Sequence, residues 1–148
     1  MTWKKTVASD RGSAITEFIV VAVLILMPMA YIVMSVMRVQ AATLASTQAA
    51  REAGRAFTQS ANLPAAFNAA NMAAGLAFDD QGFALPADAL SISCPGGRCL
   101  APGSTAVVDI TWAVPLPWLP ASLSARSAAA IPIHVRHVAP VDLYRVTS

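Results

Sequence analysis

The most continuous pattern in the chain is an uncharged apolar run near its beginning. Residues 18–37 read FIVVAVLILMPMAYIVMSVM, with Glu17 before the run and Arg38 after it. At about 1.5 Å per residue, a helix of this length spans roughly 30 Å, the thickness of the hydrocarbon core of a bilayer. The run therefore predicts one transmembrane helix over residues 18–37. A cleavable secretion signal is the competing interpretation, with its cleavage site at residues 39–41. The apolar region of such a signal has about 7–15 residues and is shorter than this run.

Helical character continues beyond the apolar run. Residues 39–57 are rich in alanine, the best helix former, and contain no proline. Apolar residues recur at three-, four- and seven-residue spacings and form one stripe: Val39, Ala42, Ala49, Ala53 and Phe57. Arg51, Glu52 and Arg55 lie on or beside the opposite face. The sequence predicts one helix over residues 13–57, whose stripe packs either on its own domain or on another subunit.

The remainder of the chain predicts a second helix and a sheet. Asn62-Leu63-Pro64 is typical of a helix start, and this helix would continue to Phe78. Later segments alternate apolar and polar residues with period two, which indicates an antiparallel sheet with one buried face. These segments are residues 90–94, 106–114 and 131–136, with a proline-rich connection at residues 114–123. The expected fold class is therefore α+β.

Composition and charge narrow the classes of function. Charged residues make up 12% of the chain, against about 25% in an ordinary soluble domain, and hydrophobic residues make up 56%. This composition excludes a disordered chain and argues against a fully soluble enzyme domain. Lys4, Lys5 and Arg11 supply a basic excess at the N-terminus, whereas residues 39–148 carry six arginines and six acids. Such an excess places the N-terminus of a membrane helix in the cytoplasm and predicts no binding of nucleic acid.

Candidate chemistry is sparse. Cys94 and Cys99 bracket a Pro-Gly-Gly turn, which predicts a disulfide in an oxidising compartment, with free thiols as the alternative. Two cysteines are too few for a structural metal site, which takes about four ligands. His134 and His137 would face opposite sides of a strand, so they cannot chelate one ion. With no G-x-S-x-G, H-E-x-x-H or glycine-rich phosphate motif, we expect no enzyme activity, no catalytic residue, no cofactor and no metal.

The junction before the apolar run carries a family resemblance. Residues 11–18 read RGSAITEF, in which a basic leader ends in glycine and Glu17 and Phe18 follow. This G-x-x-x-x-E-F pattern before an apolar helix resembles the class III signal of type IV prepilins and pseudopilins. RGSAITEF, together with AAREAGRA at residues 49–56, resembles more narrowly the TadE/TadF-like minor pilins (pseudopilins) of tight-adherence (Flp/Tad) systems.

The resemblance implies site residues, domains and partners. It implies that Gly12 and Ser13 form the processing site. It also implies that Glu17 and Phe18 take part in assembly. The implied domains are a leader at residues 1–12, a long helix at residues 13–57 and a periplasmic α+β domain at residues 58–148. The implied partners are prepilin peptidase, other pilins and pseudopilins, the inner-membrane assembly platform and the membrane. The implied location is the bacterial inner membrane and, after assembly, an extracellular pilus.

Two alternatives stay open beside the resemblance. The chain can be an uncleaved single-pass anchor whose periplasmic domain binds a ligand or another envelope protein. Glu17 can be an ordinary hydrated acid at the membrane interface. A carboxylate left deep and unpaired in hydrocarbon costs about 2.5–3.5 kcal/mol, which is why we expect a cationic partner for Glu17.

Overall fold

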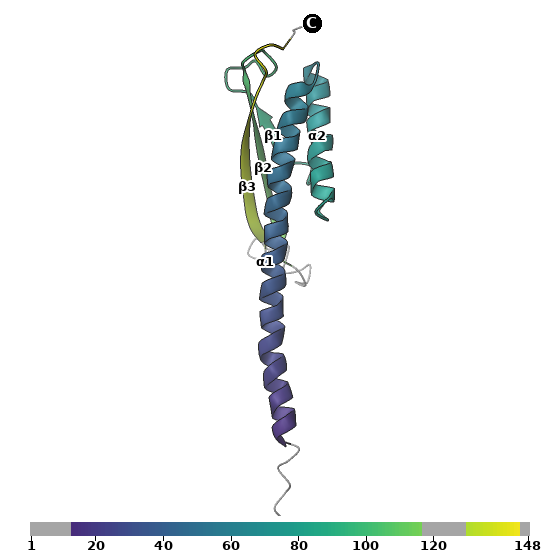
Figure 1. Cartoon of the computed structure of the whole chain (residues 1–148), viewed down its shortest axis with the longest axis vertical. Helices are drawn as coiled ribbons and strands as arrows, with labels where there is room; N and C mark the ends of the chain where they lie inside the picture. Colours follow the sequence, from purple (N-terminus) through teal and green to yellow (C-terminus); the bar gives the residue numbers. More distant parts are fainter. Residues whose placement is uncertain (1–12, 117–129, 146–148) are drawn as a thin grey trace, which may run out of the picture. The chain divides into compact units, whose positions relative to one another are not determined.

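The described part of the chain folds into two helices followed by three strands. The computed structural model describes residues 13–116 and 130–145. In chain order the elements are α1 (Ser13–Gln59), α2 (Leu63–Asp79), β1 (Leu90–Ser93), β2 (Thr105–Pro115) and β3 (Ala130–Pro140) (Figure 1). This arrangement confirms the predicted α+β class with a long helix, a second helix and an antiparallel sheet. The predicted leader and most of the proline-rich connection lie outside the described residues.

The chain divides into two compact units between Val36 and Met37, and α1 contributes to both. In the first unit nearly every side chain of α1 from Ala14 onward is exposed, and most of these side chains are apolar. The helix continues through Pro28, although proline lacks the N–H group that a helix interior uses. Residues 14–36 of the first unit therefore form an uninterrupted helical segment with a mostly apolar surface.

In the second unit α1 buries one stripe of small residues. Buried positions recur at spacings of three and four residues: Ala42, Ala45, Ser46, Ala49, Ala50, Ala53, Gly54 and Phe57. The stripe is wider than the sequence predicts, because both α2 and the sheet pack on it. Phe57 contacts Phe67 of α2 with ring centroids 5.2 Å apart, and Ser46 contacts Trp112 of β2. Of the two predicted partners for this stripe, the structure shows the chain's own domain.

Helix α2 begins as its sequence predicts. Asn62 is the N-cap, and its Oδ1 accepts a hydrogen bond from the N–H of Ala65 at 3.0 Å. Pro64 lies in the first turn, where a missing N–H group costs no helical hydrogen bond. The buried face consists of Ala66, Ala70, Ala74, Ala77 and Phe78. The helix ends at Asp79, one residue beyond the predicted end.

The three strands pair antiparallel in the order β1-β2-β3. Ile110 of the central strand lies opposite Leu90 on one side and Val135 on the other. Even-numbered residues of β2, from Ala106 to Val114, form the buried face, which confirms the period-two pattern. Strand β3 extends beyond the predicted end at residue 136, because residues 137–140 pair with the first four residues of β2.

A partly buried hydrogen bond joins α1 to the sheet. Trp112 Nε1 donates to Ser46 Oγ at 2.8 Å, and Ser46 Oγ donates to the carbonyl of Ala42 at 2.8 Å. Phe78 and Phe83 pack edge-on against the Trp112 ring, with centroids 5.1 and 5.4 Å away. Because the buried Ser46 hydroxyl and the partly buried Trp112 N–H group both have partners, this contact joins the helix to the sheet with no polar group left unpaired.

Gly54 marks a close approach of α1 to β3. A Cβ atom at this position would lie 3.0 Å from Cβ of Ala139 and 3.1 Å from Cδ2 of His137. Gly75 of α2 is the matched case, because a Cβ atom there would meet no other atom within 4 Å. The two helical glycines therefore differ in packing but share the same poor helix propensity.

We expect Gly75→Ala to stabilise the fold and Gly54→Ala to destabilise it. Alanine is more favourable than glycine in a helix interior by about 1 kcal/mol, and at position 75 nothing opposes that gain. At position 54 the added methyl group must push β3 away, and overpacking typically costs about 1–3 kcal/mol. Urea unfolding of the full chain in detergent, followed by tryptophan fluorescence, measures both changes. Equal stabilisation by the two substitutions would show that the α1–β3 contact yields easily.

Candidate functional site

The expected processing and assembly residues lie at the start of α1. Gly12 is outside the described residues, and Ser13 is the first residue of α1. Glu17 and Phe18 follow one turn later, and both are exposed, with 73% of Phe18 accessible. Residues four apart share a face of an α-helix, so Ser13 and Glu17 lie on the same face. The start of α1 thus presents a carboxylate and an aromatic ring ahead of an apolar segment.

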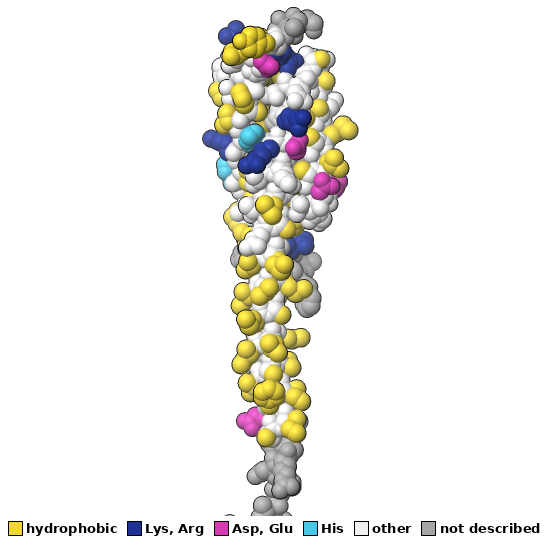
Figure 2. Space-filling model, viewed as in Figure 1, with side chains coloured by type: hydrophobic (Ala, Val, Ile, Leu, Met, Phe, Trp, Pro, Cys, Tyr) yellow, Lys and Arg dark blue, Asp and Glu magenta, His cyan; other side chains and the backbone are white. Residues whose placement is uncertain are grey.

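The apolar part of α1 is long and hydrophobic enough to cross a membrane. No part of its most apolar stretch is buried within the described chain, whereas the core helix of a soluble protein is mostly buried. A secretion signal near an N-terminus would also be a long, apolar and unburied helix. Figure 2 shows hydrophobic side chains over the visible face of this segment. The segment has the properties of a membrane span by length and composition.

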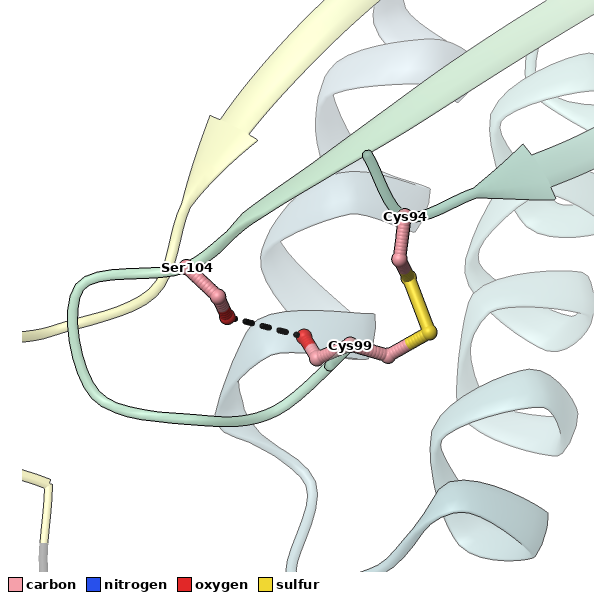
Figure 3. Close-up of a disulfide and its surroundings, with 3 residues drawn as sticks. All are labelled: Cys94, Cys99 and Ser104. Carbon is pink, nitrogen blue, oxygen red and sulfur yellow. Dashed lines mark hydrogen bonds between the residues drawn. A yellow bond between two sulfur atoms is a disulfide. The ribbon is translucent and has the colours of Figure 1, made fainter. Parts of the chain in front are cut away.

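The expected disulfide is present. Cys94 and Cys99 are bonded through their sulfur atoms, and their Cα atoms lie 5.1 Å apart (Figure 3). Between them, Gly96 and Gly97 adopt φ values of 91° and 76°, a left-handed backbone that glycine reaches without steric cost. Ser104 Oγ donates to the carbonyl of Cys99 at 3.4 Å (Figure 3). The disulfide and the neighbouring turn therefore form one linked loop.

We expect a thiol-alkylating reagent to label neither cysteine in the unreduced protein and both after reduction. The closed loop is short, so the bridge stabilises the fold by at most about 3 kcal/mol in the chain-entropy account. The Cys94→Ser, Cys99→Ser variant should accordingly still fold, with reduced stability. Intact mass after alkylation counts the labels. Two labels on the unreduced protein would contradict the bridge.

Arg145 joins the C-terminal segment to the end of α1. Its guanidinium donates hydrogen bonds to the carbonyls of Thr58 and Ser60. Carbonyl groups at a helix C-terminus lack helical partners and carry partial negative charge, which a cation complements. The N–H of Val141 donates to the carbonyl of Ser104 at 2.9 Å, so the same segment is also tied to the disulfide loop. No local sequence pattern marks Arg145, because its partners are 87 and 85 residues away.

A charged cluster lies on the face of the sheet opposite the buried, even-numbered residues of β2. Arg136 donates to Asp109 through Nε at 2.7 Å and Nη2 at 3.3 Å, and His134 Nε2 lies 3.5 Å from the same carboxylate. The hydrogen bond from Arg136 holds the pKa of the Asp109 carboxyl below its ordinary value. Any stability from this pairing is therefore present near neutral pH and lost as the pH falls through that lowered pKa. His137 lies on the buried face beside Gly54, so the two histidines face opposite sides as predicted.

A groove of about 350 Å³ lies between α1 and α2. Its lining combines two carboxylates, one amide and three apolar residues: Gln48, Glu52, Ala73, Leu76, Ala77 and Asp80. The helical pattern predicts Glu52 on or beside the face opposite the apolar stripe but does not bring it next to Asp80. That pairing depends on how α2 folds back along α1, which helical periodicity alone does not specify.

Residues 13–116 and 130–145 contain no group of three or more His, Cys, Asp or Glu side chains placed to hold a metal ion. No family model, curated protein or solved structure matches the chain. The family resemblance therefore rests on residues 11–57 of this chain.

Proposed function

We propose that this chain is a pilin-like structural subunit, a TadE/TadF-like minor pilin for the assembly of a tight-adherence pilus. One observation carries the proposal: Glu17 stands one turn into an exposed apolar helix that follows a basic leader ending in Gly12. In this proposal prepilin peptidase cuts after Gly12, and Ser13 becomes the first residue of the mature subunit. Glu17 and Phe18 then take part in assembly.

In the same proposal residues 18–37 span the bacterial inner membrane once. Three observations support that placement: the length of the apolar segment, the exposure of its side chains, and the cationic residues before it. The basic leader faces the cytoplasm and the α+β domain faces the periplasm. The Cys94–Cys99 disulfide supports an oxidising compartment for that domain.

The proposed role is structural rather than catalytic. The surface of the apolar helix is suited to packing against lipid or against similar helices, because it is uniformly hydrophobic and lacks a charged side chain from Phe18 to Val36. The proposed partners are prepilin peptidase, other pilins and pseudopilins, and the inner-membrane assembly platform. After assembly the subunit would be part of an extracellular pilus.

N-terminal sequencing and intact mass of the membrane-purified protein test the proposal. The protein is expressed in one host that has a prepilin peptidase and in a matched host that lacks it. A mature start at Ser13 in the first host alone supports the pilin-like subunit. A start at Met1 or Thr2 in both hosts instead favours an uncleaved anchor with a periplasmic binding domain. A start just after residue 41 would identify a secretion signal.

A further inference from the structure

The second unit leaves one polar stripe of α1 exposed. Leu44, Gln48, Arg51 and Arg55 are spaced by four, three and four residues and therefore share a helix face. All four are exposed, and Leu44 is 59% accessible although it is apolar. Figure 2 shows basic and acidic side chains close together on the visible face of the domain. We call these four residues the basic stripe.

The groove between α1 and α2 lies beside the basic stripe and has the opposite charge. Glu52 and Asp80 bring carboxylates from the two helices to one groove. Leu76 also lines the groove and is 64% exposed, so the groove offers apolar surface together with negative charge. An occupant that fits this groove needs basic groups carried on an apolar body.

In the part of the chain that the structure describes, no ion pair involves the charged side chains of the basic stripe or of the groove. Among the described residues, the recorded ion pairs involve only Asp109 with Arg136 and His134. Glu52 and Arg55 are three residues apart in α1, yet no ion pair forms between them. Two cations and two carboxylates therefore remain exposed on adjacent surfaces of one domain.

The exposed edge of β3 is poorly suited to pairing with a strand of another chain. The N–H of Thr111 donates to the carbonyl of Ala89, so odd-numbered residues of β2 point their backbone groups towards β1. Even-numbered residues of β2 then bond to odd-numbered residues of β3, and even-numbered residues of β3 face outward. Pro132 and Pro140 occupy such outward positions and offer no N–H group.

We propose that the groove binds the basic stripe of a second copy of this chain. Arg51 and Arg55 of one copy pair with Glu52 and Asp80 of its neighbour, and Leu44 and Leu76 supply the apolar part of the contact. Arg51 and Arg55 are four residues apart on one face of α1, about 6 Å along the helix, so both can reach a neighbour at once. A second copy of this chain has the charge that the groove requires, because the same domain carries both the basic stripe and the acidic groove.

The contact joins two different surfaces that share only Gln48 at their border, so it is heterologous. Each copy uses its basic stripe for one neighbour and its groove for another, and the association does not close unless the rotation between copies happens to form a ring. The inference goes beyond the proposed function, because it needs neither cleavage after Gly12 nor an ion pair at Glu17. Its failure and the failure of the proposed function are therefore separate results.

A zero-length cross-link tests the contact locally. The full chain carrying Arg55→Lys is prepared with ¹⁴N and with ¹⁵N, mixed in equal amounts in detergent at low salt, and treated with a carbodiimide, which couples an amine only to a carboxylate in contact with it. We expect a mixed-isotope peptide that joins position 55 of one copy to Glu52 or Asp80 of another. The matched control is Arg98→Lys, an exposed position on the disulfide loop, which should give no cross-link to the groove. Cross-links within single-isotope chains alone would overturn the proposal.

Charge reversal gives a second and independent measurement. Arg51→Glu with Arg55→Glu makes the stripe acidic, and Glu52→Arg with Asp80→Arg makes the groove basic. Each variant alone should lose self-association in sedimentation of the detergent-solubilised chain, because like charges then face each other. A mixture of the two variants should regain it, because stripe and groove are again complementary in both directions. Unchanged association of either variant alone, or no recovery in the mixture, would overturn the proposal.

Discussion

Gly12→Leu is expected to leave the full-length precursor in the membrane. In the proposed function, prepilin peptidase has to bring the peptide bond after Gly12 to its catalytic centre, and a residue without a side chain permits close approach of the backbone. A leucine side chain at this position would keep the bond away, so the leader would stay attached. The effect should be nearly complete, and the intact mass of the membrane protein measures it directly.

Ala8→Leu is the matched control for this experiment. It places the same side chain in the leader, four residues before the junction, and should leave cleavage unchanged. Membrane insertion of both variants is expected to be normal, because neither substitution adds a charge near the apolar segment. A mature start at Ser13 in Gly12→Leu would contradict the pilin-like function even if the wild-type chain were cleaved at that position.

The elements of the fold were predictable where the pattern is local. Alanine content and the apolar run predict α1, and Asn62 with Pro64 predicts the start of α2. The alternation of residues 106–114 predicts the buried face of β2, because side chains of a strand point to opposite faces in turn. Each of these signals needs only residues within one element.

The packing between elements was less predictable. The predicted stripe of α1 omitted Ala45 and Ser46, because alanine and serine are common on exposed helix faces as well. Whether Ser46 is buried depends on Trp112, which donates its N–H group from β2. The close approach at Gly54 likewise depends on Ala139 of a distant strand. No local pattern contains the information that these positions meet.

The residues of the candidate site were likewise predictable where a local motif marks them and unpredictable where only the fold brings them together. Gly12 and Glu17 stand out in the sequence because a motif with fixed spacing carries them. Cys94 and Cys99 are five residues apart across a turn, so their pairing was also a local prediction, and the structure contains the bond. Glu52 and Asp80 form a shared groove only after α2 has folded back along α1, so the sequence gives no signal for it.

Glu17→Leu is expected to block assembly while leaving insertion and cleavage largely intact. In the proposed function, cleavage after Gly12 creates an α-amino group at Ser13, which is cationic at neutral pH with a reference pKa of about 7.7–8.0 unless it is methylated. Ser13 and Glu17 share a face of α1, so a pair within one subunit can form. If subunits pack with an axial offset, as the family resemblance implies, the amino group of an incoming subunit meets Glu17 of its neighbour instead.

The size of the effect follows from the surroundings of this pair. Among apolar helices two opposite charges offset each other's desolvation, whereas removing one partner leaves the other buried alone at a cost of about 3–5 kcal/mol. A loss of that size at each subunit contact is a factor of more than about 100 in the equilibrium constant, since 1.4 kcal/mol is about tenfold. Insertion should not suffer, because the leucine lengthens the apolar segment.

Three variants separate the charge of Glu17 from its size. Glu17→Leu and Glu17→Gln both remove the negative charge, and Glu17→Asp keeps it on a shorter side chain. We expect the first two to lose co-purification with partner pilins and surface pilus yield at equal expression, and Glu17→Asp to retain part of both. Intact mass confirms that each variant still begins at Ser13, so a defect in assembly is not mistaken for a defect in processing. Undiminished assembly of Glu17→Leu would mean that Glu17 is an ordinary hydrated acid at the membrane interface, because a buried cation stranded without its partner could not leave the yield unchanged.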